Sequence, residues 1–177
     1  MNIKAKCKYD YETCKAVAHI STYKKYGPKK TITIRFIFVF VLMLLNFLII
    51  AFSGGSSINL LTFGCGALLV VLELFMYFAV PKIQYKSLSK MKDLTNEYVF
   101  SDDGFTADCN SEEYKGKSEV KYSLLIKAFE TKRYFFLFEN KRQAFVVDKS
   151  TLENGTAEEI REKISAVIGK KYVLCKY

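Results

Sequence analysis

The chain has 177 residues, half of them apolar, and its 27 Lys and Arg against 18 Asp and Glu give a formal net charge of +9. This apolar fraction excludes a disordered or basic nucleic-acid-binding tail, and the length excludes a large enzyme. Residues 36–80 hold a single charged side chain, Glu73, whereas the flanking segments are strongly charged. The chain therefore has room for one membrane hairpin and one soluble domain of about 100 residues.

The first 30 residues predict a short strand and then a helix close to the membrane. Residues 2–9 alternate between polar and apolar side chains, and Asp10 is placed to cap a helix. Gly27 and Pro28 end this helix, because proline cannot continue it. The helix carries an apolar stripe of Tyr11, Cys14, Val17 and Ala18. The stripe either packs on the C-terminal domain or lies on the lipid surface, and its small side chains favour packing on the domain.

Two long apolar runs follow, at residues 31–52 and 58–80. They are 22 and 23 residues long, enough for each to cross a hydrocarbon core of ~30 Å as a helix. Residues 53–57 are small and uncharged and permit only antiparallel neighbours, so the runs predict a transmembrane hairpin. The positive-inside rule places both termini in the cytoplasm, because basic residues flank the open end of the hairpin: Lys24, Lys25, Lys29, Lys30, Arg35, Lys82, Lys86, Lys90 and Lys92.

Five cysteines fit a cytoplasmic placement. Their number is odd and no Cys-x-x-Cys pair occurs, which indicates free thiols in a reducing compartment. Cys7, Cys14 and His19 are the only candidates for a zinc site, and their spacing matches no known zinc finger. No metal and no cofactor are therefore expected.

Beyond a linker, the pattern changes to the two-residue period of strands. Tyr98 and Phe100 alternate before a hairpin turn at residues 102–104. Alternation from Val120 to Ala128 predicts a further strand. Residues 133–138 are apolar on both faces, which predicts a central strand, and residues 144–147 follow as another.

One amphipathic helix closes the domain. Thr156 and Glu159 form a capping box, and apolar residues recur behind it on one face at Ile160, Ile164, Val167 and Ile168. The predicted fold is a two-helix transmembrane hairpin plus an antiparallel curled sheet or small barrel capped by a C-terminal helix. The predicted segments are a strand and juxtamembrane helix (1–30), a first membrane helix (31–52), an extracytoplasmic turn (53–57), a second membrane helix (58–80), a linker (81–96) and a cytoplasmic domain (97–177).

These motifs resemble the YcxB-like family in their order along nearly the whole chain. The similar segments are Tyr98-x-Phe100-x-Asp102-Asp103-Gly104-Phe105, residues 120–123, residues 130–131 with 134–138, and residues 143–147 with Lys149. The resemblance implies a multi-pass protein of the bacterial cell (inner) membrane with a pleckstrin-homology-like C-terminal domain. Lys149 matches the family's lysine at a strand end, and Asp148 stands where family members usually carry a proline.

Glu73 and Arg35 are the two charged side chains inside the predicted spans. At the helical rise they lie roughly 10 Å and 6 Å from the cytoplasmic end, so their side chains are within reach of each other. Such a pair locks the hairpin, whereas an intramembrane carboxylate is also a candidate for proton transfer or partner docking. Lys82 at the interface is the alternative partner for Glu73. Asn46 is expected to hydrogen-bond between the two helices.

The basic residues near the membrane have a second expected use, which is contact with anionic lipid headgroups. The candidates are Lys24, Lys25, Lys29, Lys30, Lys82 and Lys86. Residues 1–35 carry nine basic and two acidic groups, whereas residues 81–177 carry 18 basic and 15 acidic ones. The soluble domain is thus nearly balanced, so nucleic acid is not an expected partner.

The sequence contains no Gly-x-Ser-x-Gly, P-loop or His-Glu-x-x-His motif, and no enzyme activity is expected. It predicts a non-catalytic membrane protein that presents a cytoplasmic protein- or lipid-binding domain, as a scaffold or regulator of another membrane protein. The alternative is an immunity protein that protects the producing cell from a membrane-acting toxin or bacteriocin. Expected partners are anionic membrane lipids, a membrane protein or toxin, and a second copy of the chain.

Overall fold

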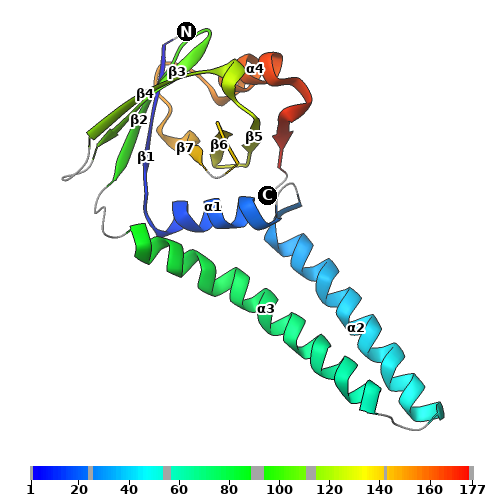
Figure 1. Cartoon of the computed structure of the whole chain (residues 1–177). Helices are drawn as coiled ribbons and strands as arrows, with labels where there is room; N and C mark the ends of the chain where they lie inside the picture. Colours follow the sequence, from blue (N-terminus) through cyan, green and yellow to red (C-terminus); the bar gives the residue numbers. More distant parts are fainter. Residues whose placement is uncertain are drawn as a thin grey trace.

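The computed structural model describes residues 2–23, 26–53, 57–88, 94–110, 115–141 and 143–175. A helical hairpin carries a mixed α and β domain at its open end, and a shorter helix lies between the two (Figure 1). Lys24, Lys25 and residues 54–56 of the predicted turn lie outside the described residues, as does most of the second half of the predicted linker.

The short helix is α1, Tyr11–Tyr23, and it begins as the sequence predicts. The backbone N–H of Thr13 donates to Oδ1 of Asp10 at 2.8 Å, which caps the helix. The next helix begins at Gly27, which has a positive φ of 74°, and its first turn also holds Pro28. Helix α1 packs on both helices of the hairpin, so it bridges their open ends.

The hairpin consists of α2, Gly27–Ser53, and α3, Ser57–Leu88. Within the described residues, both are long and apolar enough to cross a membrane. Large apolar side chains such as Phe40, Phe52 and Leu61 are exposed along them. Helix α3 continues through Pro81 to residue 88, so the first half of the predicted linker is helical.

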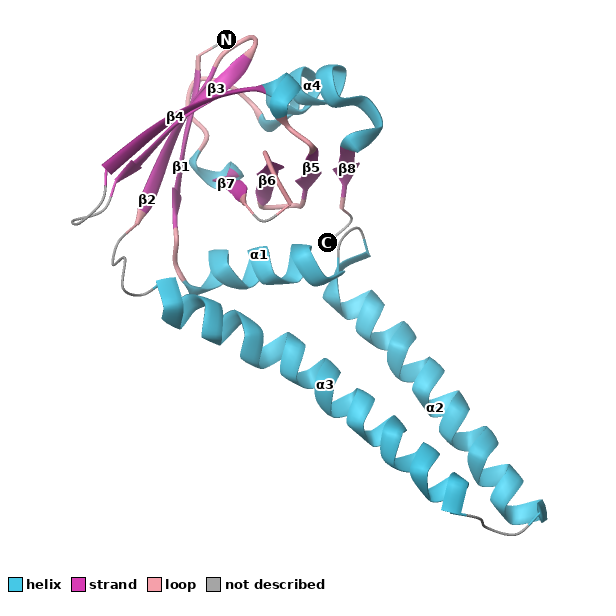
Figure 2. Cartoon of the chain, viewed as in Figure 1, coloured by secondary structure: helices cyan, strands magenta, loops and turns pink. Residues whose placement is uncertain are grey.

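Four antiparallel strands form sheet A in the order β1-β2-β3-β4. Strand β1 precedes the hairpin, whereas the other three follow it; the bounds are Ile3–Lys8, Thr95–Phe100, Gly104–Asn110 and Lys115–Lys121. Strand β1 pairs with β2 in a register that sets Ile3 opposite Phe100. Residues 1–30 were predicted as a segment separate from the C-terminal domain, but this pairing makes β1 part of that domain (Figure 2).

Sheet B has the order β7-β6-β5-β8 among the described residues. Its strands are Ala144–Asp148, Tyr134–Phe138, Lys127–Glu130 and Tyr172–Leu174. Strand β6 lies between two neighbours and is buried over its first four residues, which confirms the predicted central strand. Strand β8, which the sequence analysis did not predict, runs parallel to β5, so the expectation of an entirely antiparallel sheet is wrong.

The single strand predicted from Val120 to Ala128 is also wrong. A 3-10 turn, η2 (Tyr122–Leu124), interrupts it and carries the chain from sheet A to sheet B. The Tyr122 hydroxyl donates to the carbonyl oxygen of Ser101 at 3.0 Å and holds this ring in the core, whereas Leu124 is 56% exposed. Tyr122 and Leu125 fill the core from this irregular segment, whereas Ile126 of the predicted alternation is 43% exposed, so burial does not follow the two-residue period across the corner.

Helix α4, Ala157–Ile168, lies against η2 and β8 at the corner between the two sheets (Figure 2). The predicted capping box is confirmed, because Thr156 and Glu159 each bind the other's backbone N–H. Ile160 and Ile164 are fully buried, but Val167 is 51% exposed, so its predicted place on the apolar face is wrong. The core of the domain comprises the inner faces of both sheets and this helix.

Candidate functional site

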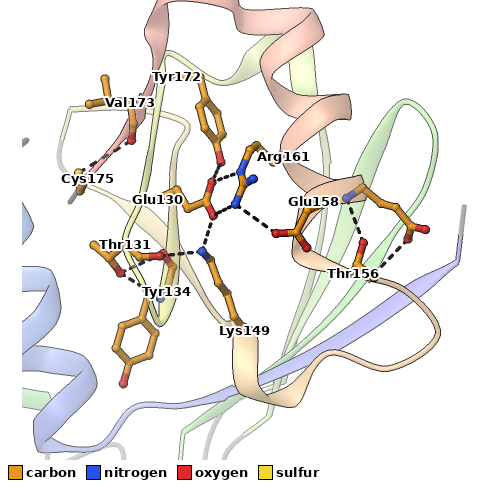
Figure 3. Close-up of polar contacts among 11 residues, drawn as sticks. Glu130, Thr131, Tyr134, Lys149, Thr156, Glu158, Arg161, Tyr172, Val173 and Cys175 are labelled. Carbon is orange, nitrogen blue, oxygen red and sulfur yellow. Dashed lines mark hydrogen bonds and ion pairs between the residues drawn. The ribbon is translucent and has the colours of Figure 1, made fainter. Parts of the chain in front are cut away.

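A buried carboxylate joins four elements of the domain (Figure 3). Glu130, the last residue of β5, is 0% exposed. Arg161 of α4 binds it with two hydrogen bonds, Nε to Oε2 and Nη2 to Oε1, each of 2.7 Å. Lys149 of η3 (Lys149–Thr151) and the Tyr172 hydroxyl of β8 also donate to it. These four residues are called the Glu130 cluster below.

The Glu130 cluster keeps its carboxylate ionised. Burial by itself raises the pKa of Glu130, but the hydrogen bonds from Arg161, Lys149 and Tyr172 outweigh it and hold the pKa at about 2. Burial, and then the hydrogen bond to Glu130, raise the pKa of the Tyr172 hydroxyl, so it stays a donor. Both carboxylate oxygens accept two donors, an arrangement that holds strands and a helix together.

The same cluster fixes the turn between β5 and β6. The Lys149 ammonium donates to the carbonyl oxygen of Thr131 at 2.7 Å, and the Lys149 backbone N–H donates to that of Arg133 at 2.8 Å. The backbone N–H of Thr131 donates to the Tyr134 carbonyl oxygen at 2.9 Å. Residues 131–133, called the β5–β6 turn below, are therefore held from behind by buried hydrogen bonds.

A groove of about 260 Å³ lies between the β5–β6 turn and α1. Lys15 and His19 line it from α1, Lys132 and Arg133 line it from the turn, and Tyr134 lines it from the start of β6. His19 is 8% exposed and its imidazole stacks on the ring of Tyr77 at 4.9 Å between centroids. Burial lowers the pKa of His19, so its imidazole is neutral at pH 7.

Arg35 of α2 and Glu73 of α3 form the ion pair that their depths suggested. Nη1 of Arg35 lies 2.7 Å from Oε2 of Glu73, and the guanidinium also lies 5.9 Å from the centre of the Tyr23 ring of α1. The pair thus links all three helices. The pair also lines an open pocket of about 460 Å³ between the two long helices, whose other walls are apolar. Further along the hairpin, Asn46 donates to the Thr62 hydroxyl, as expected for an interhelical hydrogen bond.

The other sequence-derived candidates lie apart from one another. Lys29 and Lys30 are exposed in the first turn of α2, and Lys82 and Lys86 are exposed near the end of α3. Lys149 lies in the Glu130 cluster instead, within the domain. In the part of the chain that the structure describes, Cys7, Cys14 and His19 do not gather as a metal site, nor does any other group of three such side chains.

Sequence reasoning missed the Glu130 cluster and the groove. One signal was present, because Glu130 shares a strand face with Ala128 in an apolar alternation, where a charge must have a partner. Its partners Arg161 and Tyr172 carry no such signal. The groove residues Lys132 and Arg133 resemble any charged turn in the sequence, and only the docking of α1 gives them a second wall.

Comparisons with known proteins show a similarity to one family over part of the chain. The searches of curated proteins and of solved structures each found no match. Residues 100–164 match the family model described as YcxB-like protein. This stretch runs from the end of β2 through most of α4 and includes Glu130, Lys149 and Arg161. The resemblance seen in the sequence is therefore confirmed over residues 100–164, which are similar to the YcxB-like family.

Proposed function

We propose that α2 and α3 cross a membrane as a pair and hold the β domain at its cytoplasmic face. One observation carries the proposal, which is the pairing of β1 with β2. Strand β1 precedes α2 and β2 follows α3, so the segments at both ends of the hairpin must lie on the same side of any bilayer. The exposed apolar side chains of both helices are the surface that lipid would cover.

The side chains at the open end of the hairpin support a bacterial inner-membrane placement with this end in the cytoplasm. Exposed Tyr26 and Tyr85 lie near the domain end of α2 and α3, where aromatic rings favour the membrane interface. The Lys30 ammonium lies 5.3 Å from the centre of the Tyr26 ring. Exposed lysines near both rings fit the positive-inside rule, and α1 would lie at the level of the headgroups.

We also propose that the domain is pleckstrin-homology-like. Support comes from its two four-stranded sheets, joined by a corner at η2, and from the single C-terminal helix that packs at this corner. The extra strand β1 precedes the hairpin in the sequence, whereas its partner β2 follows the hairpin. Folds of this kind present rigid surfaces and strand edges to partners.

Within this placement the domain works by binding protein or lipid, as a scaffold or regulator of another membrane protein. The ionised Glu130 is fully engaged with Arg161, Lys149 and Tyr172, so it supports the architecture rather than a reaction. The β5–β6 turn and α1 face each other across a groove next to the membrane helices, which offers a ligand both rigidity and charge.

Cysteine labelling tests the proposed topology. In intact cells, a membrane-impermeant maleimide should label Ser57→Cys at the closed end of the hairpin and should leave Cys109 unlabelled. Cys109 is a free, partly exposed thiol on β3, so permeabilised cells provide the control in which it reacts. Alkaline carbonate should leave the chain in the membrane. Release of the intact chain by carbonate, or labelling of Cys109 from outside, would contradict the placement.

Co-purification tests the binding role. Mild detergent extraction of the full chain should yield a membrane protein or an anionic lipid in stoichiometric amount. The matched sample is the same chain after a wash in harsh detergent, which removes weakly held partners. A bare chain after mild extraction, with neither protein nor lipid in fixed ratio, would overturn a role in binding while leaving the membrane placement intact.

A further inference from the structure

The groove between α1 and the β5–β6 turn also reaches the first long helix. Besides α1 and the turn, it is lined by Pro28 in the first turn of α2. A ligand in the groove would therefore touch the domain, the bridging helix and the start of the first long helix. Its volume of about 260 Å³ accommodates a group the size of several water molecules.

We propose that this groove binds the phosphate of an anionic phospholipid headgroup. The inference rests on the proposed function, because only a chain inserted through α2 and α3 holds the groove at the bilayer surface. It differs from general attraction by surface lysines, since it assigns one open groove with cations on two walls. The following observations carry it.

The wall formed by the turn supplies free positive charge. Lys132 is exposed and makes no ion pair or hydrogen bond with the residues that the structure describes. Arg133 directs Nε and Nη2 to Oδ2 of Asp148, at 3.0 and 2.9 Å, which fixes its guanidinium. The guanidinium also lies 5.0 Å from the centre of the Tyr134 ring. Arg133 is thus pre-oriented, while Lys132 is the cation left to meet an anion.

The opposite wall adds a third cation, Lys15 of α1. Its ammonium lies 3.7 Å from the Glu12 carboxylate, and both side chains are partly or largely exposed, so this pair is loose. The groove has three cations, Lys15, Lys132 and Arg133. Two carboxylates, Glu12 and Asp148, pair with them, so one positive charge is in surplus (three minus two). That surplus matches the single negative charge of a phosphodiester.

One buried hydroxyl of the groove lacks a partner. The hydroxyl of Tyr134 has no hydrogen-bond partner among the described residues, although this residue is only 6% exposed. Figure 3 shows Tyr134 pointing away from the Glu130 cluster. The neutral imidazole of His19 donates to the backbone of Tyr77 instead, so its Nε2 carries no proton and is not a donor for an anion. Buried polar atoms are rarely left without a partner, and a phosphate oxygen in the groove would supply the acceptor that the Tyr134 phenol lacks.

The test counts lipids bound to the full chain. The protein is reconstituted in vesicles of phosphatidylcholine and phosphatidylglycerol and extracted again in mild detergent, and each lipid is quantified by mass spectrometry. We expect phosphatidylglycerol to be enriched over the vesicle composition, at about one molecule per chain. Lys132→Ala should reduce this enrichment about fivefold, and so should Tyr134→Phe, which removes only the unpartnered hydroxyl.

Lys117→Ala is the matched control, because it removes an equal charge from exposed β4, away from the groove. Equal losses in Lys117→Ala and Lys132→Ala would overturn the site in favour of diffuse surface charge. Displacement of phosphatidylglycerol by inorganic phosphate, with no preference for the lipid, would show that the groove takes a soluble anion and would overturn the headgroup. A chain that never enters the vesicles contradicts the proposed function instead, so the two failures are distinguishable.

Discussion

Replacing Glu130 with glutamine is expected to lower the free energy of unfolding of the domain by about 3–5 kcal/mol. The change keeps the shape of the side chain and removes its charge, so Arg161 and Lys149 lose their shared counter-ion inside the protein. Tyr172 loses a charged acceptor as well. The measurement is denaturant unfolding of the full chain in detergent, followed by near-UV circular dichroism of its tyrosines.

Glu158→Gln provides the matched control. Glu158 also lies near Arg161, with Oε1 3.5 Å from Nη2, but its side chain is 66% exposed. Exposed pairs of this kind contribute little, so the control should lose less than about 0.5 kcal/mol. Similar losses in the two variants would show that burial of the Glu130 cluster does not determine its contribution.

The free energy of unfolding should also depend on pH through the ionisation of Glu130. The pKa of Glu130 falls from 4.5 to about 2 in the folded chain, because the donors from Arg161, Lys149 and Tyr172 overcome the effect of burial. A lowered pKa stabilises the fold above pH 4.5, and this contribution is lost as the pH falls from 4.5 toward 2. Glu130→Gln should show a shallower loss over this range, and parallel curves would contradict the assignment.

Gly104→Ala is the second substitution with a large expected effect, a loss of about 3 kcal/mol. A Cβ atom at Gly104 would lie 2.3 Å from the carbonyl oxygen of Val120 and 2.9 Å from Cα of Lys121. Both obstacles are backbone of the neighbouring strand, and β3 pairs with β4 at this point. The added methyl must separate the two strands, because no flexible side chain can move aside.

Gly64→Ala is the control, since nothing lies within 4 Å of a Cβ atom there. Alanine also favours a helix, so this variant should be as stable as the unmodified chain or slightly more so. Both variants are compared by the midpoint of thermal unfolding in the same detergent. If Gly104→Ala unfolds at the temperature of Gly64→Ala, the close approach of β3 and β4 at Gly104 is wrong.

Much of the fold could be predicted where the signal is local. The two apolar helices, the capping box at Thr156 and the central strand β6 depend on patterns within one segment. The pairing of β1 with β2 could not be predicted, because alternation shows that a strand exists but not which distant strand accepts its hydrogen bonds. The corner at η2 was missed because no glycine or proline marks it.

Only part of the candidate site could likewise be predicted from the sequence. Arg35 and Glu73 could be paired from the sequence, since charges in apolar runs are few and their depths are set by the helical rise. The Glu130 cluster draws on β5, η3, α4 and β8, and the groove depends on how α1 docks. Contacts among so many separate elements follow from the tertiary structure alone.

The place of β1 in sheet A means that this sheet cannot close until both long helices have been translated. Strand β1 leaves the ribosome first, but its partner β2 is translated only after both long helices. Until then the strand's backbone groups have no neighbour, and nascent-chain chaperones can reach them. In the proposed membrane placement, the sheet closes only after α2 and α3 have been inserted, so folding of the β domain would report that insertion is complete.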